Sequence, residues 1–501
     1  MRLRQLLAGA EIGNVTGPID VEVHSVAHDS RRVTPGGIFF ALHGEKLDGT
    51  KFIEDALRRG AVAIAADEAW SGRPVWLGKD VTWVGLLPGS ARRGLARAAA
   101  NFYRHPADGL QLIGVTGTNG KTTTTFLVDS ILREAGLRPG LIGTIEHRTP
   151  KGSRAAANTT PESVDLQQMF AEIRDSGGTH VVLEASSHAL AMERLWGCHF
   201  GVVIFTNLTR DHLDYHKTFE EYFAAKRILF EGTGAGAPGI GVVNIDDPYA
   251  AQLTGLARRT LTYGLKGSSE VTARRFALSF DGLEFVAETP IGNIEVHSAL
   301  VGRFNVYNIL AAIGAGIGLN VAKNQIEDGI AKLQSVPGRF QRIDEGQPFL
   351  VVVDYAHTDD ALRNLITTAR ELGPSARIIT VFGAGGERDR SKRPVMGEAA
   401  GSLSDLVVLT SDNPRGEDPL RIINDVVVGL QRSNAKYRVE PEREQAIAAA
   451  FEEARPGDIV LLAGKGHETY QVLRDGTVDF DDREKARAIL RSKGYSKTRS
   501  E

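Results

Sequence analysis

A chain of 501 residues with 42% hydrophobic and 24% charged side chains is long enough for roughly two to four globular domains. The net charge of −3 argues against non-specific nucleic-acid binding, and the one cysteine, Cys198, excludes a disulfide framework. No run of about 18 apolar residues predicts a membrane span, and the apolar run after Met1 is too short for a secretory signal. We therefore expect a cytoplasmic protein with Cys198 as a buried structural thiol.

The first 88 residues predict a compact α/β domain. Its apolar runs predict three strands, at 21–26, 37–42 and 61–65. A helical pattern at 50–59 precedes the last of these strands. Polar loops at 29–32 and 44–49 follow the first two strands. Each loop is ordinary by itself, and only together do they suggest a place for the polar head group of a ligand.

A basic helix predicted at 90–103 leads into the stretch around which the rest is organised. Residues 112–115 predict a buried strand, and Lys121 and Thr122 open a helix that is predicted to end at Glu134. Glycines let backbone N–H groups surround an anion, lysine neutralises the β- and γ-phosphates, and the threonine hydroxyl can ligate Mg²⁺. The first of the three glycines (Gly114, Gly117 and Gly120) stands one place earlier than usual. This variant phosphate-binding loop predicts ATP binding.

The remaining pattern predicts two doubly wound α/β domains. Continuous apolar runs favour mainly parallel sheets that are covered on both faces. In the first domain the strands are 141–145, 179–184, 201–206 and 239–244, followed by a β-rich part at 258–300 and helices at 305–317 and 323–333. In the second they are 349–354, 377–382, 406–410 and 458–463. The predicted domains are 1–88, 89–336 and 337–501. A glycine-rich turn at 383–386 is too weak a signal for dinucleotide binding.

Polar residues follow two strands of the predicted central sheet. Glu184 ends one strand, and the segment 206–216, which includes His212, follows another. Ligands gather at the carboxyl ends of parallel strands, so a carboxylate and an imidazole beside a phosphate loop favour a metal site. Lys226, in a helix predicted at 219–230, would by itself be read as a solvated lysine.

The order and spacing of these motifs resemble the Mur ligases, the ATP-dependent amide-forming enzymes of peptidoglycan precursor synthesis. The resemblance covers essentially the whole chain. It includes Gly302-Arg-Phe-Asn-Val-Tyr-Asn308, Pro337-Gly-Arg-Phe340 and Asp354-Tyr-Ala-His357. Three further motifs look most like the family branch that adds meso-2,6-diaminopimelate: Gly385-Gly-Glu-Arg-Asp-Arg390, Asp412-Asn-Pro-Arg415 and Gly464-Lys-Gly-His-Glu468.

The resemblance implies a three-domain α/β fold and assigns candidate sites. It places ATP on Gly117, Thr118, Asn119, Gly120, Lys121, Thr122, Thr123, Asn305, Asn308, Arg339, Asp354 and His357. It places the substrate UDP-MurNAc-L-Ala-D-Glu on Ser30, the 44–48 loop with Gly44, Asn158, Thr159, Thr160, Ser186 and Arg194. Relatives usually carry a glutamine two residues before that arginine, where this chain has Met192, so one expected polar contact is missing or supplied elsewhere.

The resemblance also implies the chemistry. ATP would phosphorylate the D-glutamyl side-chain carboxylate, and the amine of diaminopimelate would attack the acyl phosphate. The catalytic residues would be Lys121, Glu184, His212 and Lys226, which matches a lysine that is carbamylated in relatives. Mg²⁺ ions would lie on Thr122, Glu184, His212 and the carbamate. Diaminopimelate would bind to Arg388, Asp412, Asn413, Pro414, Arg415, Gly464 and Glu468, with the distal carboxylate on Arg415.

Alternatives remain open at this point. The chain could add L-lysine instead, although lysine-adding relatives generally lack the arginine at position 415. Folylpolyglutamate synthetase lacks the N-terminal domain, and neither it nor the D-Ala-D-Ala-adding ligase typically carries Asp-Asn-Pro-Arg. A phosphate-loop switch or binding module would not need Glu184, His212 and Lys226. We expect an enzyme that works as a monomer.

Overall fold

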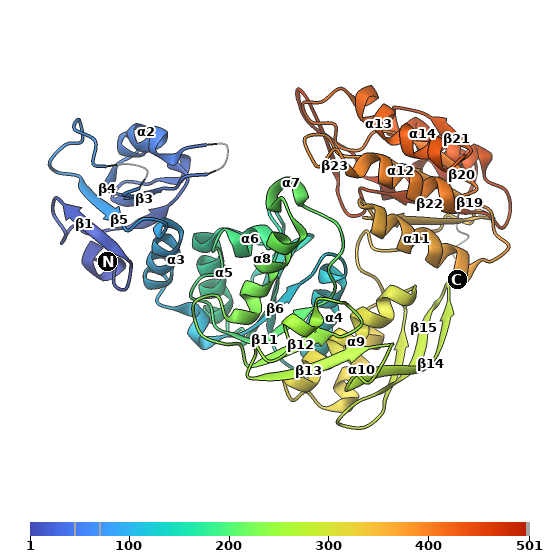
Figure 1. Cartoon of the computed structure of the whole chain (residues 1–501), viewed down its shortest axis with the longest axis horizontal. Helices are drawn as coiled ribbons and strands as arrows, with labels where there is room; N and C mark the ends of the chain where they lie inside the picture. Colours follow the sequence, from blue (N-terminus) through green and yellow to red (C-terminus); the bar gives the residue numbers. More distant parts are fainter. Residues whose placement is uncertain (45–46, 70–71, 497–501) are drawn as a thin grey trace.

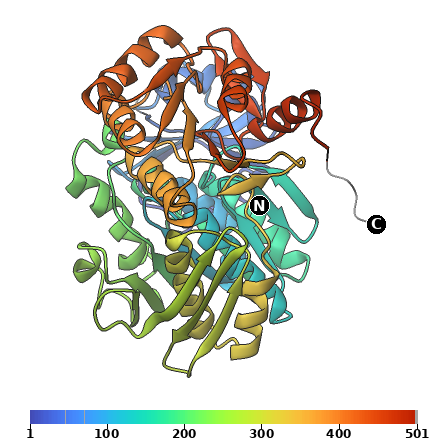
Figure 2. The ribbon, with the colours of Figure 1, turned by 90° about the vertical axis from the view of Figure 1, so that its right-hand side faces the viewer.

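The computed structural model of the protein describes residues 1–44, 47–69 and 72–496. Three lobes follow one another along the chain, each built on its own sheet, with the central lobe between the other two (Figure 1). Seen from the C-terminal side, the C-terminal lobe stands above the central one (Figure 2). The predicted α/β class with mainly parallel sheets and three domains is confirmed.

The N-terminal lobe has a five-stranded sheet in the order β1-β5-β4-β3-β2. The strands are β1 (Ile12–Thr16), β2 (Ser25–Ala27), β3 (Gly37–Ala41), β4 (Ala61–Asp67) and β5 (Thr82–Leu86), with helices α2 (Ile53–Arg58) and α3 (Ala91–Phe102) beside them. The strand predicted at 21–26 is wrong apart from its end, because Val21 and Val23 pair with the first turn of the chain instead. β1 was not predicted, because four of its five residues are exposed and the strand therefore lacks an apolar run.

The central lobe is organised on β6 (Gln111–Thr116), which lies between the parallel strands β10 (His180–Glu184) and β11 (Phe200–Phe205). The eleven strands run β16-β15-β14-β13-β12-β11-β6-β10-β7-β8-β9, and the strands nearest each edge pair antiparallel. The outer strands are β7 (Pro139–Ile142), β8 (Glu146–Thr149), β9 (Gly152–Ala155), β12 (Ile240–Asn244), β13 (Arg259–Gly264), β14 (Val271–Ser279), β15 (Gly282–Glu288) and β16 (Ile294–Ser298).

Helices cover both faces of this sheet, which explains the continuous apolar runs. Leu112 of β6 packs into one hydrophobic cluster, and Ile113 and Val115 pack into another. The helices are α4 (Lys121–Glu134), α5 (Ser163–Asp175), α6 (Ser187–Ala191), α7 (Leu213–His216), α8 (Phe219–Glu231), α9 (Arg303–Gly318) and α10 (Lys323–Lys332). No helix in the described part of the chain is long and apolar enough to cross a membrane.

The C-terminal lobe repeats the doubly wound pattern on a six-stranded sheet, β17-β18-β22-β19-β20-β21. Its strands are β17 (Gln341–Ile343), β18 (Leu350–Asp354), β19 (Ile378–Phe382), β20 (Leu406–Leu409), β21 (Tyr437–Val439) and β22 (Ile459–Ala463). Its helices are α11 (Asp359–Leu372), α12 (Lys392–Leu403), α13 (Pro419–Arg432), α14 (Arg443–Glu453) and α15 (Asp482–Ser492). A separate hairpin, β23 (Tyr470–Leu473) and β24 (Gly476–Asp479), follows β22.

Cys198 is buried in the core of the central lobe, as predicted. Burial raises the pKa of its thiol to about 12, so the reactive thiolate is scarce at pH 8. We expect no reaction of the native protein with a thiol reagent such as 5,5′-dithiobis(2-nitrobenzoate), and one reacting thiol per chain after unfolding in urea. The absorbance of the released thiolate measures both, with Cys198→Ser as the blank. Rapid reaction of the native protein would contradict this burial.

Candidate active site

The loop between β6 and α4 has the backbone shape that an anion site requires. Gly117 and Gly120 have φ values of 145° and 87°, which favour glycine. A Cβ on Gly117 would overlap the Thr206 hydroxyl, and one on Gly120 would overlap the Asn308 amide. The loop is also tied to the end of β11, because the backbone N–H of Thr118 donates to the carbonyl of Asn207 at 2.8 Å. The predicted strand, loop and helix are therefore all present.

The loop opens on a cavity of about 710 Å³ between the central and C-terminal lobes. Most of the residues predicted for ATP and catalysis line it: Thr118, Asn119, Gly120, Lys121, Thr122, Thr123, Glu184, His212, Lys226, Asn308, Arg339, Asp354 and His357. Of the predicted ATP set within the described ranges, Gly117 and Asn305 lie outside this lining. Asn305 instead supports Asn308, whose Nδ2 donates to its Oδ1 at 2.8 Å.

Two lysines share one backbone acceptor at the phosphate loop. The Nζ atoms of Lys121 and Lys226 donate to the carbonyl of Gly117 at 3.0 and 2.7 Å. Lys226 is fully buried and lies over the ring of Tyr222, 4.3 Å from its centroid. Burial and then the charge of Lys121 lower the pKa of Lys226 far below its usual value. The site therefore favours a neutral amine at Lys226.

Glu184 is buried between hydroxyl and amide donors at the end of β10. Thr122 Oγ1 donates to its Oε2 at 3.1 Å. Thr144 contributes both its backbone N–H, 2.8 Å from Oε1, and its hydroxyl, 3.0 Å from Oε2. Arg339 reaches the same place from the C-terminal lobe, with Nη2 3.2 Å from Thr122 Oγ1. Thr144 was not predicted as a site residue, because the strand was expected to extend to 145, whereas β7 ends at Ile142.

This oxygen-rich corner fits Mg²⁺. The Thr122 hydroxyl and the Glu184 carboxylate are hard ligands, and Mg²⁺ is usually held by one or two carboxylates together with water and substrate phosphates. Within residues 1–44, 47–69 and 72–496, no three His, Cys, Asp or Glu side chains gather as a ready-made metal cage. The arrangement thus fits an ion that takes most of its ligands from elsewhere, and Glu184 and Thr122 are the residues that would hold it.

His212 begins the short helix α7 with a left-handed φ of 53°. Its imidazole faces the cavity, with 42% of the side chain exposed and Nε2 3.4 Å from Asp211. Desolvation by the surrounding protein lowers the pKa of His212 to about 3, opposed by the charge of Asp211 and helped by that of Lys121. The imidazole is therefore neutral at pH 7 and available as a nitrogen ligand.

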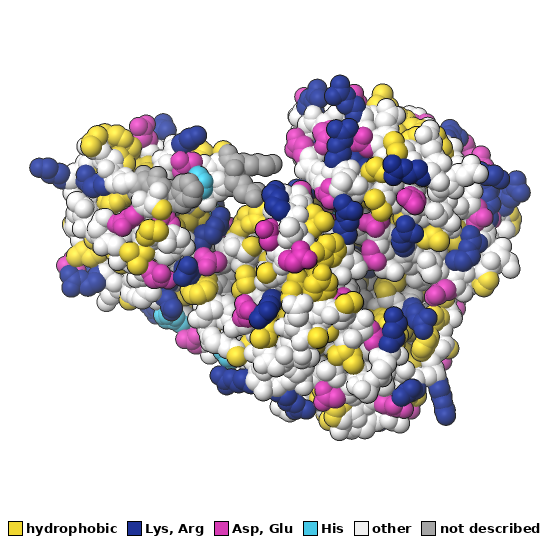
Figure 3. Space-filling view, in the orientation of Figure 1, with side chains coloured by type: hydrophobic (Ala, Val, Ile, Leu, Met, Phe, Trp, Pro, Cys, Tyr) yellow, Lys and Arg dark blue, Asp and Glu magenta, His cyan; other side chains and the backbone are white. Residues whose placement is uncertain are grey.

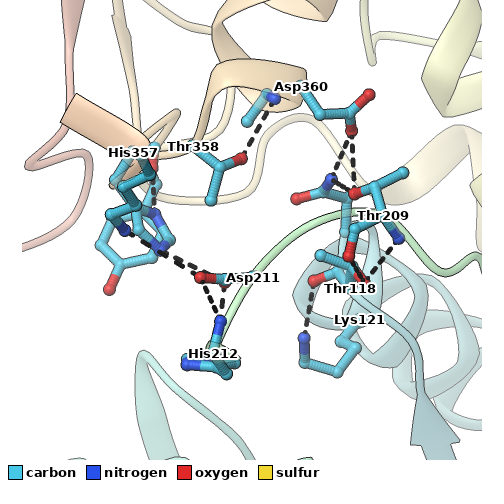
Figure 4. A network of polar contacts seen from close by, with 12 residues as sticks. Thr118, Lys121, Thr209, Asp211, His212, His357, Thr358 and Asp360 are labelled. Carbon is cyan, nitrogen blue, oxygen red and sulfur yellow. Dashed lines mark hydrogen bonds and ion pairs between the residues drawn. The ribbon is translucent and has the colours of Figure 1, made fainter. Parts of the chain in front are cut away.

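Polar contacts connect the phosphate loop to the C-terminal lobe across the cavity (Figure 4). The Oδ2 atom of Asp360, in the first turn of α11, accepts from Asn119 Nδ2 at 2.7 Å and from the Thr209 hydroxyl at 3.2 Å. A second contact between the two lobes joins Asp211 of the central lobe to His357 of the C-terminal lobe, with Oδ2 and Nε2 4.0 Å apart. Asp360 was not predicted as a site residue, because its partners lie about 150 and 240 residues away in the sequence.

The residues predicted for the peptide end of the substrate form one cluster beside this corner. Thr160 Oγ1 donates to the carbonyl of Glu184 at 2.6 Å and accepts from the N–H of Ser186 at 3.1 Å. Arg194 Nη1 donates to the carbonyl of Thr160 at 2.9 Å.

Met192 occupies the position where a glutamine was expected. Its thioether sulfur lies 3.5 Å from Arg194 Nη2, so this position offers the arginine only a weak hydrogen-bond acceptor. Asn158 and Thr159 adjoin the cluster, bonded to His147 and Thr144.

The remaining substrate residues lie in the N-terminal lobe. Ser30 is buried in a short 3-10 helix, and its hydroxyl bonds to the carboxylate of Asp55. The N–H of Gly44 donates to the carbonyl of Leu47 at 2.9 Å. Residues 45 and 46 of the predicted 44–48 loop lie outside the described residues. The space-filling view shows a notch between the N-terminal and C-terminal lobes above the central one (Figure 3).

The residues predicted for diaminopimelate come together in the C-terminal lobe. Asn413 Nδ2 donates to Glu468 Oε2 at 2.9 Å, and a Cβ on Gly464 would lie 3.4 Å from Asp412. Arg388 and Arg415 flank Gly385: a Cβ there would lie 3.2 Å from Arg415 Nη1 and 3.7 Å from Arg388 Cγ.

The backbone at Arg415 is strained and held in place. Its φ is 53°, a left-handed value that is unusual outside glycine and occurs often at functional sites. The N–H of Arg415 donates to the carbonyl of Val472 in β23 at 3.0 Å, and the side chain of Asn413 accepts from the N–H of Val472 at 2.9 Å. The hairpin thus fixes the Asp412-Asn-Pro-Arg415 turn and the direction of its arginine.

Comparison with known proteins agrees with the resemblance. Three family profiles match the chain: Mur ligase family, catalytic domain, at residues 22–84; Mur ligase middle domain at 115–316; and Mur ligase, glutamate ligase domain, at 338–466. A relative from Solibacter usitatus is 52% identical over 501 residues, which cover 99% of this chain and 100% of the relative. One from Geobacter metallireducens is 44% identical over 511 residues, which cover 98% of each chain. Both are named UDP-N-acetylmuramoyl-L-alanyl-D-glutamate--2,6-diaminopimelate ligase.

Solved structures show the same architecture. A structure of a UDP-N-acetylmuramoyl-L-alanyl-D-glutamate--2,6-diaminopimelate ligase is 32% identical with a TM-score of 0.65, covering 99% of this chain and 100% of that one. MurF from Acinetobacter baumannii has a TM-score of 0.64 at 19% identity, covering 92% of this chain and 94% of that one. At that level of identity the second likeness concerns the fold alone.

Proposed function

Because the chain belongs to the Mur ligase family, we propose that it joins meso-2,6-diaminopimelate to the D-glutamyl residue of UDP-MurNAc-L-Ala-D-Glu at the expense of ATP. The observation that carries this proposal is the pocket around Arg415, which has a side chain for each charge at the distal end of diaminopimelate. Addition of L-lysine is the competing reaction, and the arginine is what disfavours it.

The reaction proceeds in two steps on the cavity between the lobes. The D-glutamyl carboxylate attacks the γ-phosphorus of ATP and releases ADP, which gives an acyl phosphate. The amine then attacks the acyl carbon, phosphate leaves, and the amine loses a proton as the amide forms. Lys121 now donates to the carbonyls of Gly117 and Thr118. During the reaction its ammonium would give up these bonds and neutralise the phosphoryl group that is transferred. Arg339 brings positive charge from the C-terminal lobe, and His357 adds an imidazole whose pKa is lowered by burial.

Thr122 and Glu184 would hold Mg²⁺, which would offset the charge of the triphosphate. The contacts of this chain orient both residues: Thr144 fixes the Glu184 carboxylate, and Arg339 contacts the Thr122 hydroxyl. His212 is the neutral nitrogen ligand at the same edge of the sheet.

Lys226 is the proposed site of carbamylation. Its depressed pKa supplies the neutral amine that attacks the carbon of CO₂; a C–N bond forms, and the nitrogen loses a proton to solvent. The resulting carbamate replaces a neutral amine beside Lys121 with an anion. This anion would be attracted by the Lys121 ammonium and would add an oxygen ligand near Glu184 and His212.

Substrate recognition spans all three lobes. Ser30 and Gly44 belong to the uridine end, and the cluster of Asn158–Thr160, Ser186 and Arg194 receives the peptide. We assign each substrate to one domain: residues 1–88 bind the nucleotide substrate, residues 89–336 bind ATP and residues 337–501 bind the amino acid. We place the enzyme in the cytoplasm, where its substrates are made, and expect a monomer.

The test is a comparison of two amino acids. The protein is incubated with UDP-MurNAc-L-Ala-D-Glu, ATP and Mg²⁺, with meso-diaminopimelate in one sample and L-lysine in the other, and ADP and the tripeptide product are measured. We expect turnover with diaminopimelate and at least about 10²-fold less with lysine, since a lost bidentate contact costs about 3 kcal/mol. Equal turnover would refute the role of the Arg415 pocket, and silence in both samples would refute the reaction.

A further inference from the structure

Lys465 lies inside the amino-acid pocket, and the reaction outlined above assigns it no role. It belongs to the loop that follows β22, and its side chain is fully buried. Its Nζ donates to Glu468 Oε2 at 3.0 Å and to Asn413 Oδ1 at 3.2 Å, and it lies 3.7 Å from Asp412 Oδ1. All three partners are residues proposed to bind diaminopimelate.

Burying an ammonium costs several kcal/mol unless it is paired, so this lysine needs its carboxylates. The reverse also holds, because Asp412 and Glu468 are themselves only 9% and 15% exposed. One polar atom is still unused: within the described chain, nothing donates a hydrogen bond to the buried Oδ1 of Asp412. An incoming ammonium could bond there only in competition with the charge of Lys465.

The charge balance of the pocket follows from its members. Among Lys465 and the residues proposed to bind diaminopimelate, the charged side chains are two carboxylates and three cations: Asp412, Glu468, Lys465, Arg388 and Arg415. Arg443, which contacts the carbonyl of Ser411 beside this turn, is paired with Asp482 and adds no net charge. Three positive charges minus two negative charges leave +1. The distal end of diaminopimelate carries one ammonium and one carboxylate and is neutral, whereas the distal end of lysine is a lone ammonium. A pocket with a charge of +1 accepts the first and repels the second.

Resting on the proposed function, we infer that Lys465 determines specificity: it keeps the pocket net positive and so excludes amino acids with a purely cationic distal end. Arg415 supplies attraction for the distal carboxylate, and Lys465 supplies the repulsive element that selectivity also needs. Without Lys465, Glu468 and Asp412 would form a site for a lone ammonium.

Three amino acids that differ only at the distal end test this inference. They are meso-diaminopimelate, L-lysine, which lacks the distal carboxylate, and 2-aminopimelate, which lacks the distal ammonium. The readout is the ratio of kcat/KM for 2-aminopimelate to kcat/KM for lysine. Lys465→Met removes a positive charge and should lower this ratio about tenfold or more. Asp412→Asn removes a negative charge from the same pocket and should raise it.

A purely structural role cannot move the ratio in opposite directions in these two variants. If Lys465→Met lowers kcat/KM for all three amino acids by the same factor, the inference is overturned. If that variant does not fold, Asp412→Asn decides, and an unchanged or lower ratio overturns the inference. Absence of product with diaminopimelate in the unmodified enzyme would instead refute the proposed function, so the two failures are distinguishable.

Discussion

Replacing Lys226 by alanine is expected to lower kcat by about 10³-fold, the upper end of the loss seen when one electrostatic group is removed from an active site. The buried amine contacts the phosphate loop directly, 2.7 Å from the carbonyl of Gly117, and its carbamate would face the triphosphate. Alanine leaves a cavity of about the size of a small carboxylic acid. Added formate or acetate should therefore restore part of the activity, measured as ADP release.

Two controls separate a carbamate from a plain lysine. Lys226→Arg places a positive charge at this position and cannot be carbamylated, so it should be inactive and formate should not restore activity. Lys217→Ala removes an exposed lysine nine residues earlier and should leave kcat unchanged. Removal of CO₂ from the buffer should also lower the activity of the unmodified enzyme reversibly. Full activity in Lys226→Ala would eliminate the carbamate from the reaction.

The fold was largely predictable because its signals are local. β6, the glycine loop and α4 are consecutive in the sequence, and the continuous apolar runs of β10, β11, β19 and β22 identify strands that are covered on both faces. The signal fails at the edges. β1 is an exposed edge strand without an apolar face, and the segment 21–26 alternates like a strand but pairs with the chain start.

The sequence motifs identified which segments form the site, but they did not identify the contacts between those segments. Glu184, His212 and Lys226 were found because each lies in a motif, yet the groups that hold them were not. The contact of Thr144 with Glu184 depends on where β7 ends. The contact of Tyr222 with Lys226 depends on which face α8 turns toward the phosphate loop.

The amino-acid pocket makes the second large prediction. Arg415→Ala should raise KM for diaminopimelate by about 10²-fold, because a bidentate contact with a carboxylate is worth about 3 kcal/mol. Arg415 bonds the carbonyls of Gly386 and Asn413 through Nη1, and neither bond uses Nη2 or Nε. The guanidinium can therefore keep its anchor while it takes up a carboxylate.

Initial rates at varied amino acid, ATP and nucleotide substrate measure the effect. Only KM for diaminopimelate should change markedly, because Arg415 lies in the C-terminal lobe on a turn fixed by β23, away from the phosphate loop. Arg421→Ala, an exposed arginine on α13, is the matched control and should leave all three KM values unchanged. Arg415→Lys should recover only part of the affinity, since one ammonium cannot reproduce the planar two-point contact. A rise in KM for ATP of the same size would mean that Arg415 supports the lobe and does not bind the amino acid.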